Sequence, residues 1–499
     1  EIETLDTSAS DDDHLPVVRS VRWASGAKVV EFGMSADFGD WMSPLSAYFD
    51  PPRGVVFFTG CLPSLPDESD YDLLLHDESS EAFEDEHVGL LPESPSTPTS
   101  QLAPTWPVGQ RYLLGRLLGS GSYGSVCEAW DRKCCRHVAV KQIEDIRRDG
   151  VHRRILREVA LLSHLQHPNI VKIYDLPERP DPRRVYIVME RCDTDLSQVC
   201  SHACGLSFPQ ARKLACGLVV GCRYLHSVGV YHRDLKPANC LADRDCTLKI
   251  CDFNLARSVE VDKDKDETDS LEGDEGEEND DNGETPVKLA KPRRFQRALS
   301  VQVATRPYRA PEVILTLKYT EAMDVWAAGC IIAELFMALN TGGRIPQSGP
   351  LFRGHESYPL SQDTYSLDRT GDQLDRIFDV LGTPSDEELD TIPYEGVRQH
   401  VRAYTDRIGT GLRRRIPVEA TQAGLHLLEG MVVFLHEKRM SMQEAVVHQL
   451  FEPVQGLQRA SIVSGHLDLG FDESSLPRTA TANIDQLQKE IDSFRCMQD

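Results

Sequence analysis

The pattern of hydrophobic and polar positions separates a central body with regular elements from two flanking segments. Between residues 1 and 106 the apolar residues follow no regular period. That segment is acidic and rich in serine and proline, which is typical of a disordered extension. Its less acidic part, residues 15–58, could dock on another surface. Regular patterning starts near Arg111 and continues to about residue 453. We therefore expect an acidic, largely disordered extension (1–106), a folded body (107–453) and a tail (454–499).

The first half of the body alternates short apolar runs with one helical pattern. Residues 151–165 place apolar side chains at positions 151, 155, 156, 159, 162 and 165, which is a helical period. Residues 209–226 indicate a second, apolar helix, and 484–494 in the tail show weaker helical spacing, which favours a docked or frayed helix. Runs bounded by glycine or charged residues predict strands at 112–118, 126–130, 138–141, 185–190 and 248–251.

Charge is distributed very unevenly along the chain. The 499 residues include 79 acidic and 54 basic ones, for a net charge of −25. Residues 1–100 and 260–284 together carry −29, so the remainder carries about +4. The chain is therefore better described as a near-neutral body with acidic appendages than as evenly acidic. Nucleic-acid binding is not expected, because it would need a dominant basic surface.

Length, hydropathy and cysteine usage narrow the class of protein further. The chain is long enough for two or three domains. Its apolar runs are too short for a membrane span, and it shows no initiator Met and no charged-then-apolar leader, so we expect neither a membrane protein nor a signal peptide. The 14 cysteines are scattered among apolar residues, which is typical of a reducing compartment. No pair of C-x-x-C motifs predicts a zinc site.

A glycine-rich segment, G-x-G-x-x-G-x-V, lies between two of the predicted strands. It comprises Gly119, Ser120, Gly121, Ser122, Tyr123, Gly124, Ser125 and Val126. The same spacing of glycines also fits a dinucleotide-binding fold, but there a helix follows the third glycine. Here residues 126–130 continue as a strand, which favours a hairpin lying over the phosphates of ATP.

Two charged residues after this hairpin form a second candidate pair. Lys141 ends the predicted strand 138–141, and Glu158 lies on the flank of the apolar stripe of the helix 151–165. An ion pair with Glu158 would hold Lys141 where it can bind the α- and β-phosphates.

The motif H-R-D-L-K-P-x-N at residues 232–239 carries the catalytic hypothesis. Phosphoryl transfer needs positioning and charge neutralisation more than covalent chemistry. Asp234 would accept the proton of the attacking hydroxyl group, Lys236 would contact the transferring phosphoryl group, and Asn239 would bind Mg²⁺. Asp252 follows the strand 248–251 and would be the second metal ligand.

Four further stretches complete a resemblance that covers roughly residues 108–453. They are T-R-P-Y-R-A-P-E (305–312), D-V-W-A-A-G-C (324–330), D-Q-L-D-R-I-F-D-V-L-G-T-P (372–384) and H-E-K-R (436–439). With these motifs the chain resembles the eukaryotic Ser/Thr protein kinases of the mitogen-activated and cyclin-dependent group. V-A-T-R at 303–306 favours the mitogen-activated type.

The resemblance implies an α+β, bilobal protein kinase fold. Residues 107–192 would form the N-lobe, a small antiparallel β-sheet with one main helix. Residues 193–453 would form a larger, mostly helical C-lobe, with a disordered insert in the activation segment at about 259–297. It also implies transfer of the γ-phosphate of ATP, with Mg²⁺, to Ser or Thr hydroxyl groups of proteins. Ser-Pro or Thr-Pro sites are the expected substrates, in intracellular signal transduction.

The resemblance also assigns roles residue by residue. The catalytic set is Asp234, Lys236, Asn239, Lys141, Glu158 and Thr305. ATP-binding residues are Leu118, residues 119–126 of the glycine-rich segment, Ala139, Lys141, Met189, Cys192 and Asp195, with Met189 beside adenine and Asp195 at the ribose. Glu312 and Arg439 would form a structural ion pair. The expected partners are protein substrates and an upstream activating kinase, with neither nucleic acid nor membrane; we expect a monomer in the cytoplasm, with the nucleus as a second location.

Four departures from the family pattern affect regulation more than chemistry. Asn254 stands where the family has Gly, which puts conformational switching in doubt. Ser300-Val301-Gln302 replaces the Thr-x-Tyr activation pair, so Ser300 is either the remaining phosphosite or a plain loop serine. Pro307 replaces a Trp near the substrate pocket, so the support for proline specificity is reduced. If Ser300 is phosphorylated, the arginines expected to bind its phosphate are Arg154, Arg157, Arg233 and Arg257.

The insert is the fourth departure. Its acidic run at 260–284 is followed by five bases between 288 and 297. Composition favours a solvated disordered insert, and the alternative is that it gates access to the site or recruits acidic partners. No Asp-x-x-Asp docking patch is evident after Phe451. A non-catalytic scaffold is the competing function, supported only by Asn254 and the lost Thr-x-Tyr pair.

Overall fold

The computed structural model describes residues 17–22, 28–33, 103–121, 124–148, 150–202, 205–258, 305–318, 320–342, 349–354, 372–454, 456, 467 and 480–498. The chain divides into two compact units, Glu1–Ala82 and Phe83–Asp499. In the first unit, strands β1 (Val17–Arg22) and β2 (Lys28–Gly33) pair as an antiparallel ladder. The hydrophobic pattern did not predict these two strands.

The N-lobe is built on a five-stranded antiparallel sheet with the order β3-β4-β5-β7-β6. Its strands are β3 (Tyr112–Gly121), β4 (Gly124–Asp131), β5 (Arg136–Ile143), β6 (Ile173–Asp175) and β7 (Val185–Glu190). Helix α1 (Val151–His164) is the main helix of this lobe. The antiparallel sheet with one main helix confirms the predicted N-lobe architecture.

Alternating side chains of β5 bury both faces of this sheet. Val138 and Val140 belong to a small cluster on one face with Tyr112. Ala139 and Ile143 belong to the main core, which includes the apolar side of α1. Because successive strand residues point to opposite faces, burial of both faces explains the unbroken apolar run at residues 138–140.

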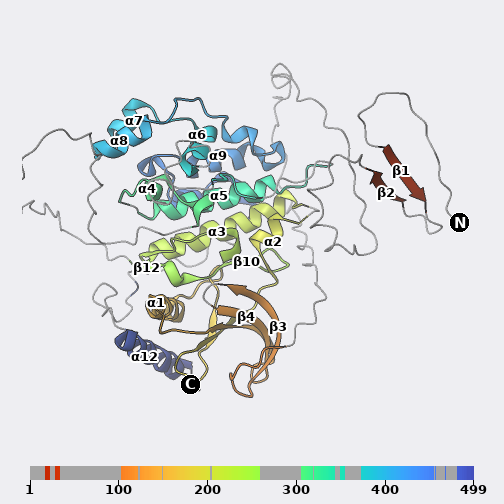
Figure 1. The fold of residues 1–499 in the computed structure, drawn as a ribbon, viewed down its shortest axis with the longest axis vertical. Helices are drawn as coiled ribbons and strands as arrows, with labels where there is room; N and C mark the ends of the chain where they lie inside the picture. The colour runs from red at the N-terminus through yellow and green to blue at the C-terminus, as the bar shows by residue number, and fades with distance from the viewer. Residues whose placement is uncertain are drawn as a thin grey trace, which may run out of the picture. The chain divides into compact units, whose positions relative to one another are not determined.

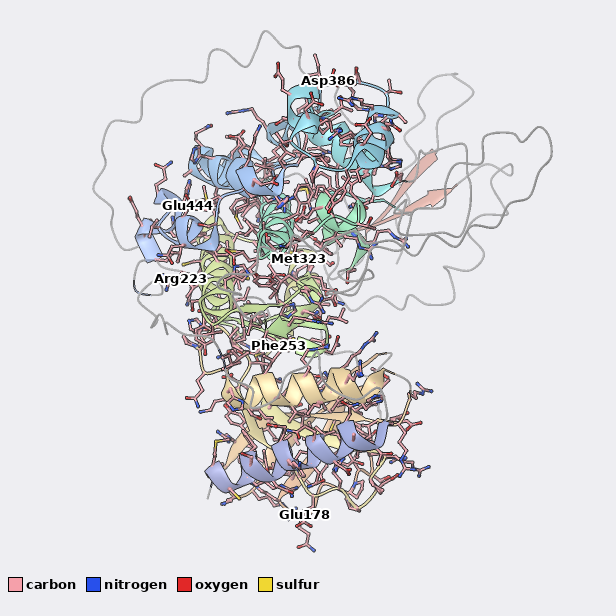
Figure 2. All side chains as sticks on the ribbon, turned by 90° about the vertical axis from the view of Figure 1, so that its left-hand side faces the viewer. Glu178, Arg223, Phe253, Met323, Asp386 and Glu444 are labelled. Carbon is pink, nitrogen blue, oxygen red and sulfur yellow. The ribbon has the colours of Figure 1, made fainter. Side chains whose placement is uncertain are left out.

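Helix α12 (Ala480–Gln498) lies beside α1, far apart in sequence but adjacent in space (Figure 1; Figure 2). Leu487, Ile491 and Phe494, spaced four and three residues apart, are buried in the main core. Arg495 Nε also donates a hydrogen bond to the carbonyl oxygen of Leu176, at 2.8 Å. The weak helical spacing at 484–494 therefore corresponds to a docked helix.

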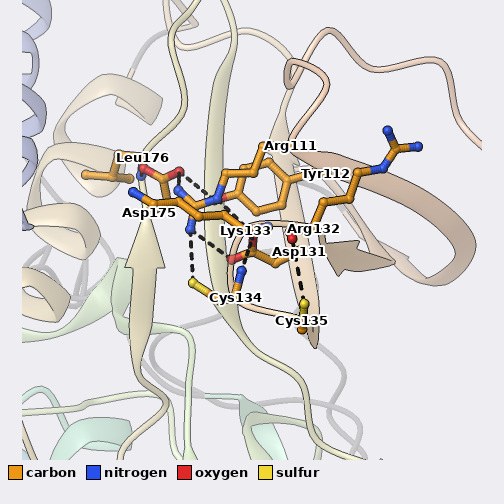
Figure 3. Close-up of polar contacts among 9 residues, drawn as sticks. All are labelled: Arg111, Tyr112, Asp131, Arg132, Lys133, Cys134, Cys135, Asp175 and Leu176. Carbon is orange, nitrogen blue, oxygen red and sulfur yellow. Dashed lines mark hydrogen bonds and ion pairs between the residues drawn. The ribbon is translucent and has the colours of Figure 1, made fainter.

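A cluster of charged residues fastens the start of β3 to β4 and β6 (Figure 3). Arg111 binds Asp131 with two parallel hydrogen bonds, of 2.9 and 2.8 Å, and Asp175 with a third, of 3.0 Å. Asp131 also accepts the backbone N–H groups of Lys133 and Cys134 in the β4–β5 turn. The Asp131 carboxylate therefore accepts hydrogen bonds both from the guanidinium group of Arg111 and from the backbone of the turn.

The C-lobe is mostly helical, as predicted, and α3 and α5 form its centre (Figure 1). The serine at the start of α3, Ser207, forms a capping box with Gln210, and proline occupies the first turn. Its helices are α2 (Leu196–Cys200), α3 (Phe208–Ser227), α4 (Pro311–Ile314), α5 (Ala322–Met337), α6 (Gln373–Leu381), α7 (Asp386–Asp390), α8 (Glu395–Arg402), α9 (Thr421–Met431) and α10 (Met442–Val446). Its short strands are β8 (Thr194–Asp195), β9 (Val230–Tyr231), β10 (Cys240–Ala242), β11 (Leu248–Ile250) and β12 (Arg257–Ser258).

Glu312 and Arg439 form a buried ion pair in the C-lobe. Arg439 donates two hydrogen bonds to Glu312, of 2.7 and 2.6 Å. Its remaining N–H groups reach the backbone carbonyl oxygens of Val433, Ala322 and Phe434. This is the pair that the resemblance implied.

Within the described residues, no helix has the length and apolar character that a bilayer span requires.

Candidate active site

Lys141 lies at the centre of the N-lobe sheet, opposite Val126 in β4 and Ile187 in β7. Its Nζ atom is 2.5 Å from Oε1 of Glu158 on α1 and 3.5 Å from Oδ1 of Asp252. Burial lowers the pKa of Lys141, but the Glu158 and Asp252 carboxylates outweigh it, so the net pKa is raised. The ammonium group therefore stays charged and is held by two carboxylates, one on α1 and one just after β11.

Asp252 stands just after β11, which brings it to the same place. Its backbone is left-handed, with φ of 67°, an unusual conformation for a residue other than glycine. The backbone N–H of Cys251, its neighbour, donates a 3.0 Å hydrogen bond to the carbonyl oxygen of Asn239. β10 and β11 continue this contact by pairing Cys240 with Ile250. The two predicted metal ligands, Asn239 and Asp252, are therefore brought together by the backbone.

Asp234 accepts hydrogen bonds from three predicted site residues. Lys236 Nζ donates to its Oδ2 atom at 2.7 Å, and Thr305 donates to Oδ1 at 2.8 Å. Asn239 Nδ2 donates to the Asp234 carbonyl oxygen at 2.8 Å and to Oδ2 at 3.3 Å. Since the amide nitrogen of Asn239 is used here, its amide oxygen is the atom left for a cation.

Two buried side chains that the sequence analysis did not assign hold this loop. Asp324, at the start of α5, accepts the backbone N–H groups of His232 and Arg233 at 2.8 and 2.9 Å. Burial opposes ionisation of Asp324, but the hydrogen bond and charge of His226 outweigh it and lower its pKa. His232 Nε2 lies 3.0 Å from the carbonyl oxygen of Cys251, which joins this loop to the Asp252 segment. Asp324 is the first residue of the motif D-V-W-A-A-G-C, and this position is the sequence signal that could have pointed to its role.

The glycines of the hairpin between β3 and β4 differ in what surrounds them. A Cβ atom at Gly124 would stand 1.8 Å from the carbonyl oxygen of Gln142, at a φ of 153°, so only glycine fits. Around Gly119 and Gly121 the space is open to 4 Å, so a ligand can approach the backbone there. Ser122 and Tyr123 lie outside the described residues, and Ser125 pairs with Ser120 across the hairpin.

The apolar residues that the resemblance assigns to the nucleotide site come from the strands of the N-lobe and the segment just after β7. Ala139 and Met189 pair across β5 and β7 and are nearly buried. Leu118 is 40% exposed although it is apolar, and Val126 is partly buried. Cys192 is also partly buried, and burial raises the pKa of its thiol.

Asp195 is placed differently from the other nucleotide-binding candidates. Its carboxylate caps α2, accepting the backbone N–H groups of Ser197 and Gln198 at 2.8 and 3.1 Å. The side chain of Gln198 donates to its second oxygen at 2.7 Å. Leu241 on β10 lies opposite Asp195 and is an apolar, partly buried residue that the sequence analysis did not assign.

The donor set fits a metal–nucleotide complex. Within the described residues no three His, Cys, Asp or Glu side chains gather in a way that could hold a metal alone. Mg²⁺ prefers one or two protein oxygens together with phosphate and water, which matches one amide oxygen of Asn239 and one carboxylate of Asp252. The open backbone at Gly119 and Gly121 and the charged Lys141 Nζ suit the phosphates.

Two of the four arginines predicted to bind a phosphate contact the backbone of the segment that follows Asp252. Arg157 Nη1 donates to the carbonyl oxygen of Asn254 at 2.7 Å, and Arg233 Nε donates to that of Leu255 at 2.7 Å. Arg257 follows two residues later, and Arg154 lies one turn before Arg157 on α1. Arg157 and Arg233 are buried by these backbone contacts. Ser300 lies outside the described residues.

Asn254 and Pro307, the two positions that depart from the family pattern, each form a hydrogen bond. Asn254 is buried, and its Nδ2 atom donates a hydrogen bond of 2.6 Å to Oδ1 of Asp252. Pro307 lies in a short 3₁₀ turn, Arg306–Tyr308, and its carbonyl oxygen accepts a 3.4 Å hydrogen bond from Gln373.

Known proteins are similar to most of this chain. The family described as "Protein kinase domain" matches residues 112–451. "Mitogen-activated protein kinase MPS1" of Pyricularia oryzae is 33% identical over 346 residues, or 68% of this chain and 71% of that protein. "Mitogen-activated protein kinase 15" of Oryza sativa subsp. japonica is 35% identical over 364 residues, or 70% and 61%. "Extracellular signal-regulated kinase 1" of Dictyostelium discoideum is 31% identical over 406 residues, or 78% and 66%.

The match covers both lobes, and the similar proteins carry the names of mitogen-activated protein kinases. The enzyme class predicted from the sequence, a protein serine/threonine kinase, is confirmed. The chain belongs to the protein kinase family and is similar to its mitogen-activated members.

Proposed function

We propose that this kinase transfers the γ-phosphate of Mg-ATP to Ser or Thr residues that precede proline in proteins of a signalling pathway. The observation that carries the proposal is a pair of side-chain networks around the site. Lys141 joins Glu158 to Asp252, and Asp234 joins Lys236, Asn239 and Thr305. Each of these groups has a part in phosphoryl transfer.

The chemistry assigned to the residues is an in-line displacement. The hydroxyl oxygen of the substrate forms a bond to the γ-phosphorus while the bond to the leaving oxygen of ADP breaks. Asp234 orients the hydroxyl group and takes its proton, and Lys236 lies 2.7 Å from the same carboxylate, close to the charge that develops. Lys141 binds the non-transferred phosphates. Asn239 and Asp252 would hold Mg²⁺, which offsets phosphate charge when bound.

The proposed partners are protein substrates and an upstream activating kinase. The names of the similar proteins and the motif at residues 303–306 support them. We also propose a monomer in the cytoplasm and the nucleus. No cysteine of the described residues forms a disulfide bond, as is usual in a reducing compartment. Light scattering of the purified protein and imaging of a tagged protein in cells test these two points.

Phosphate transfer to matched peptides tests the proposed function. We expect the wild type to phosphorylate a Ser-Pro peptide at least about tenfold faster than its Ser-Ala counterpart. Asp234→Asn should lose most of this activity and still bind ATP, because Lys141 and the glycine-rich segment are unchanged. Equal rates on both peptides would contradict the proline preference alone. Wild-type rates in Asp234→Asn would contradict the catalytic assignment.

A further inference from the structure

Asn254 lies two residues after Asp252, one of the two proposed metal ligands, and stands where the family has Gly. Its side chain forms a hydrogen bond to Asp252. Its amide nitrogen lies 2.6 Å from Oδ1 of Asp252, and Asn254 is 8% exposed. A hydrogen bond to a carboxylate is among the stronger hydrogen bonds in proteins. Glycine at this place has no side chain that could make it.

The backbone of the same residue is fastened to helix α1. Arg157 Nη1 donates a 2.7 Å hydrogen bond to the carbonyl oxygen of Asn254. Arg157 directly precedes Glu158, the partner of Lys141. Asn254 therefore contacts Asp252 through its side chain and α1 through its backbone.

The hydrogen bond also divides the two oxygens of Asp252 between different tasks. Oδ1 receives Asn254 and faces Lys141 Nζ at 3.5 Å. Among the described residues, no hydrogen bond or ion pair reaches Oδ2. Since Oδ1 is occupied, Oδ2 is the oxygen that a cation can take without displacing a protein donor.

The backbone conformation of Asp252 is one that surrounding contacts have to hold in place. Its left-handed conformation, with φ of 67°, is sparsely populated by residues other than glycine and persists where surrounding contacts hold it. Asn254 supplies such a contact two residues away. A glycine there would leave both the carboxylate and the backbone freer to move.

We propose that Asn254 is a positioning residue that fixes the orientation of the Asp252 carboxylate for the divalent cation. This inference rests on the proposed function, because it assumes that Asp252 binds the metal of the metal–nucleotide complex. It predicts that the side-chain amide, rather than the loss of glycine flexibility alone, sets the affinity for the cation.

Binding of Mn²⁺, followed by its electron paramagnetic resonance signal in the presence of a saturating non-hydrolysable ATP analogue, tests the inference. We compare wild type with Asn254→Ala and Asn254→Gly. Both variants lose the amide donor, but only the second gains backbone freedom. We expect the dissociation constant for Mn²⁺ to rise about tenfold in both, as loss of a hydrogen bond to a charged group implies. Affinity for the nucleotide in the presence of EDTA should change less than about twofold, since no phosphate-binding residue is altered.

Each outcome separates the inference from the proposed function. Unchanged Mn²⁺ affinity in Asn254→Ala overturns the inference, and so does a loss confined to Asn254→Gly, which would point to backbone freedom. Equal loss of metal-free nucleotide binding in both variants also overturns it, because the role would then be structural. A wild type that binds no Mn²⁺ with the nucleotide overturns the proposed function, and the inference with it.

Discussion

At the scale of single residues, Glu312 and Arg439 show how much a buried charge depends on its partner. Their side chains are 2% and 0% exposed, and the guanidinium group has no water to replace a lost carboxylate. Glu312→Gln leaves the positive charge uncompensated, so we expect the free energy of unfolding to fall by about 3–5 kcal/mol. Urea denaturation measures it.

A surface ion pair provides the matched control. Asp386 and Arg402 lie 3.0 Å apart, but the Asp386 side chain is 81% exposed. Asp386→Asn should cost less than about 1 kcal/mol. Equal losses in the two variants would show that burial does not set the cost.

Asp131 gives a pH dependence with a definite sign. The hydrogen bonds from Arg111 lower its pKa to about 2, although burial opposes them. The folded state therefore holds this carboxyl group ionised at a pH where the unfolded chain takes up a proton. The resulting stabilisation, about 2 kcal/mol, is fully present above about pH 4 and is lost as the pH falls through 2.

Unfolding free energies of wild type and Asp131→Asn, measured between pH 6 and pH 3, test this sign. The difference between the two proteins should shrink by about half at pH 3. A difference that stays constant, or grows on acidification, would show that the depressed pKa of Asp131 does not contribute.

The sequence identified Asp234 and Asn239 from a motif. It identified Lys141, Glu158 and Asp252 from their places at the end of a strand, on a helix flank and just after a strand. It could not reveal the contact of Asn254 with Asp252. That contact depends on a side-chain rotamer and on a left-handed backbone, and neither leaves a pattern in the sequence. Asp195 illustrates the same limit, since its role as a helix cap emerges only with the fold.

At the scale of elements, the β3–β4 hairpin depends on its third glycine. A Cβ atom at Gly124 would collide with the backbone of β5, whereas one at Gly121 would meet open space. We expect Gly124→Ala to lower the melting temperature by several degrees, because backbone atoms cannot yield cheaply. Gly121→Ala should keep the melting temperature and weaken ATP binding. Thermal unfolding and nucleotide titration separate the two, and the reverse ranking of melting temperatures would contradict this assignment.

Helix α12 supports the helix that carries Glu158. Leu487 is fully buried in the main core, whereas Met497 on the same helix is 61% exposed. Leu487→Ala should therefore reduce the free energy of unfolding by about 2–5 kcal/mol and speed hydrogen exchange in α1. Met497→Ala should stay within about 0.5 kcal/mol of wild type. Equal effects would mean that α12 is not docked as described.

Two helices with a clear helical period and the strands 185–190 and 248–251 were predicted closely, whereas several other elements were not. Residues 151–165 and 209–226 correspond to α1 and α3 within one residue at each end. The two-residue strands β8 and β9 hold too few positions for any period. The ladder of β1 and β2 was missed because neighbouring valines and charged residues there break the strict alternation of apolar and polar residues.

At the scale of the whole catalytic unit, the nucleotide should stabilise both lobes together. Lys141 belongs to the N-lobe sheet, while Asn239 and Asp252 belong to the C-lobe. A ligand at 100 times its dissociation constant adds about 2.7 kcal/mol to the stability of the state that binds it. We expect one cooperative melting transition that shifts upward by at least about 3 °C with Mg-ATP. Lys141→Met should show a smaller shift, and equal shifts would contradict a phosphate-binding role for Lys141.

The docking of α12 on α1 also has a consequence for how the enzyme is made. The 315 residues between the two helices must be translated before they can meet. At synthesis rates of about 5–20 residues per second, this takes about 15–60 s. During that interval the apolar surface that α12 covers on the N-lobe stays open to chaperones and to other nascent chains. We expect a ribosome-bound chain to remain unable to phosphorylate its neighbours until residues 480–498 have been added.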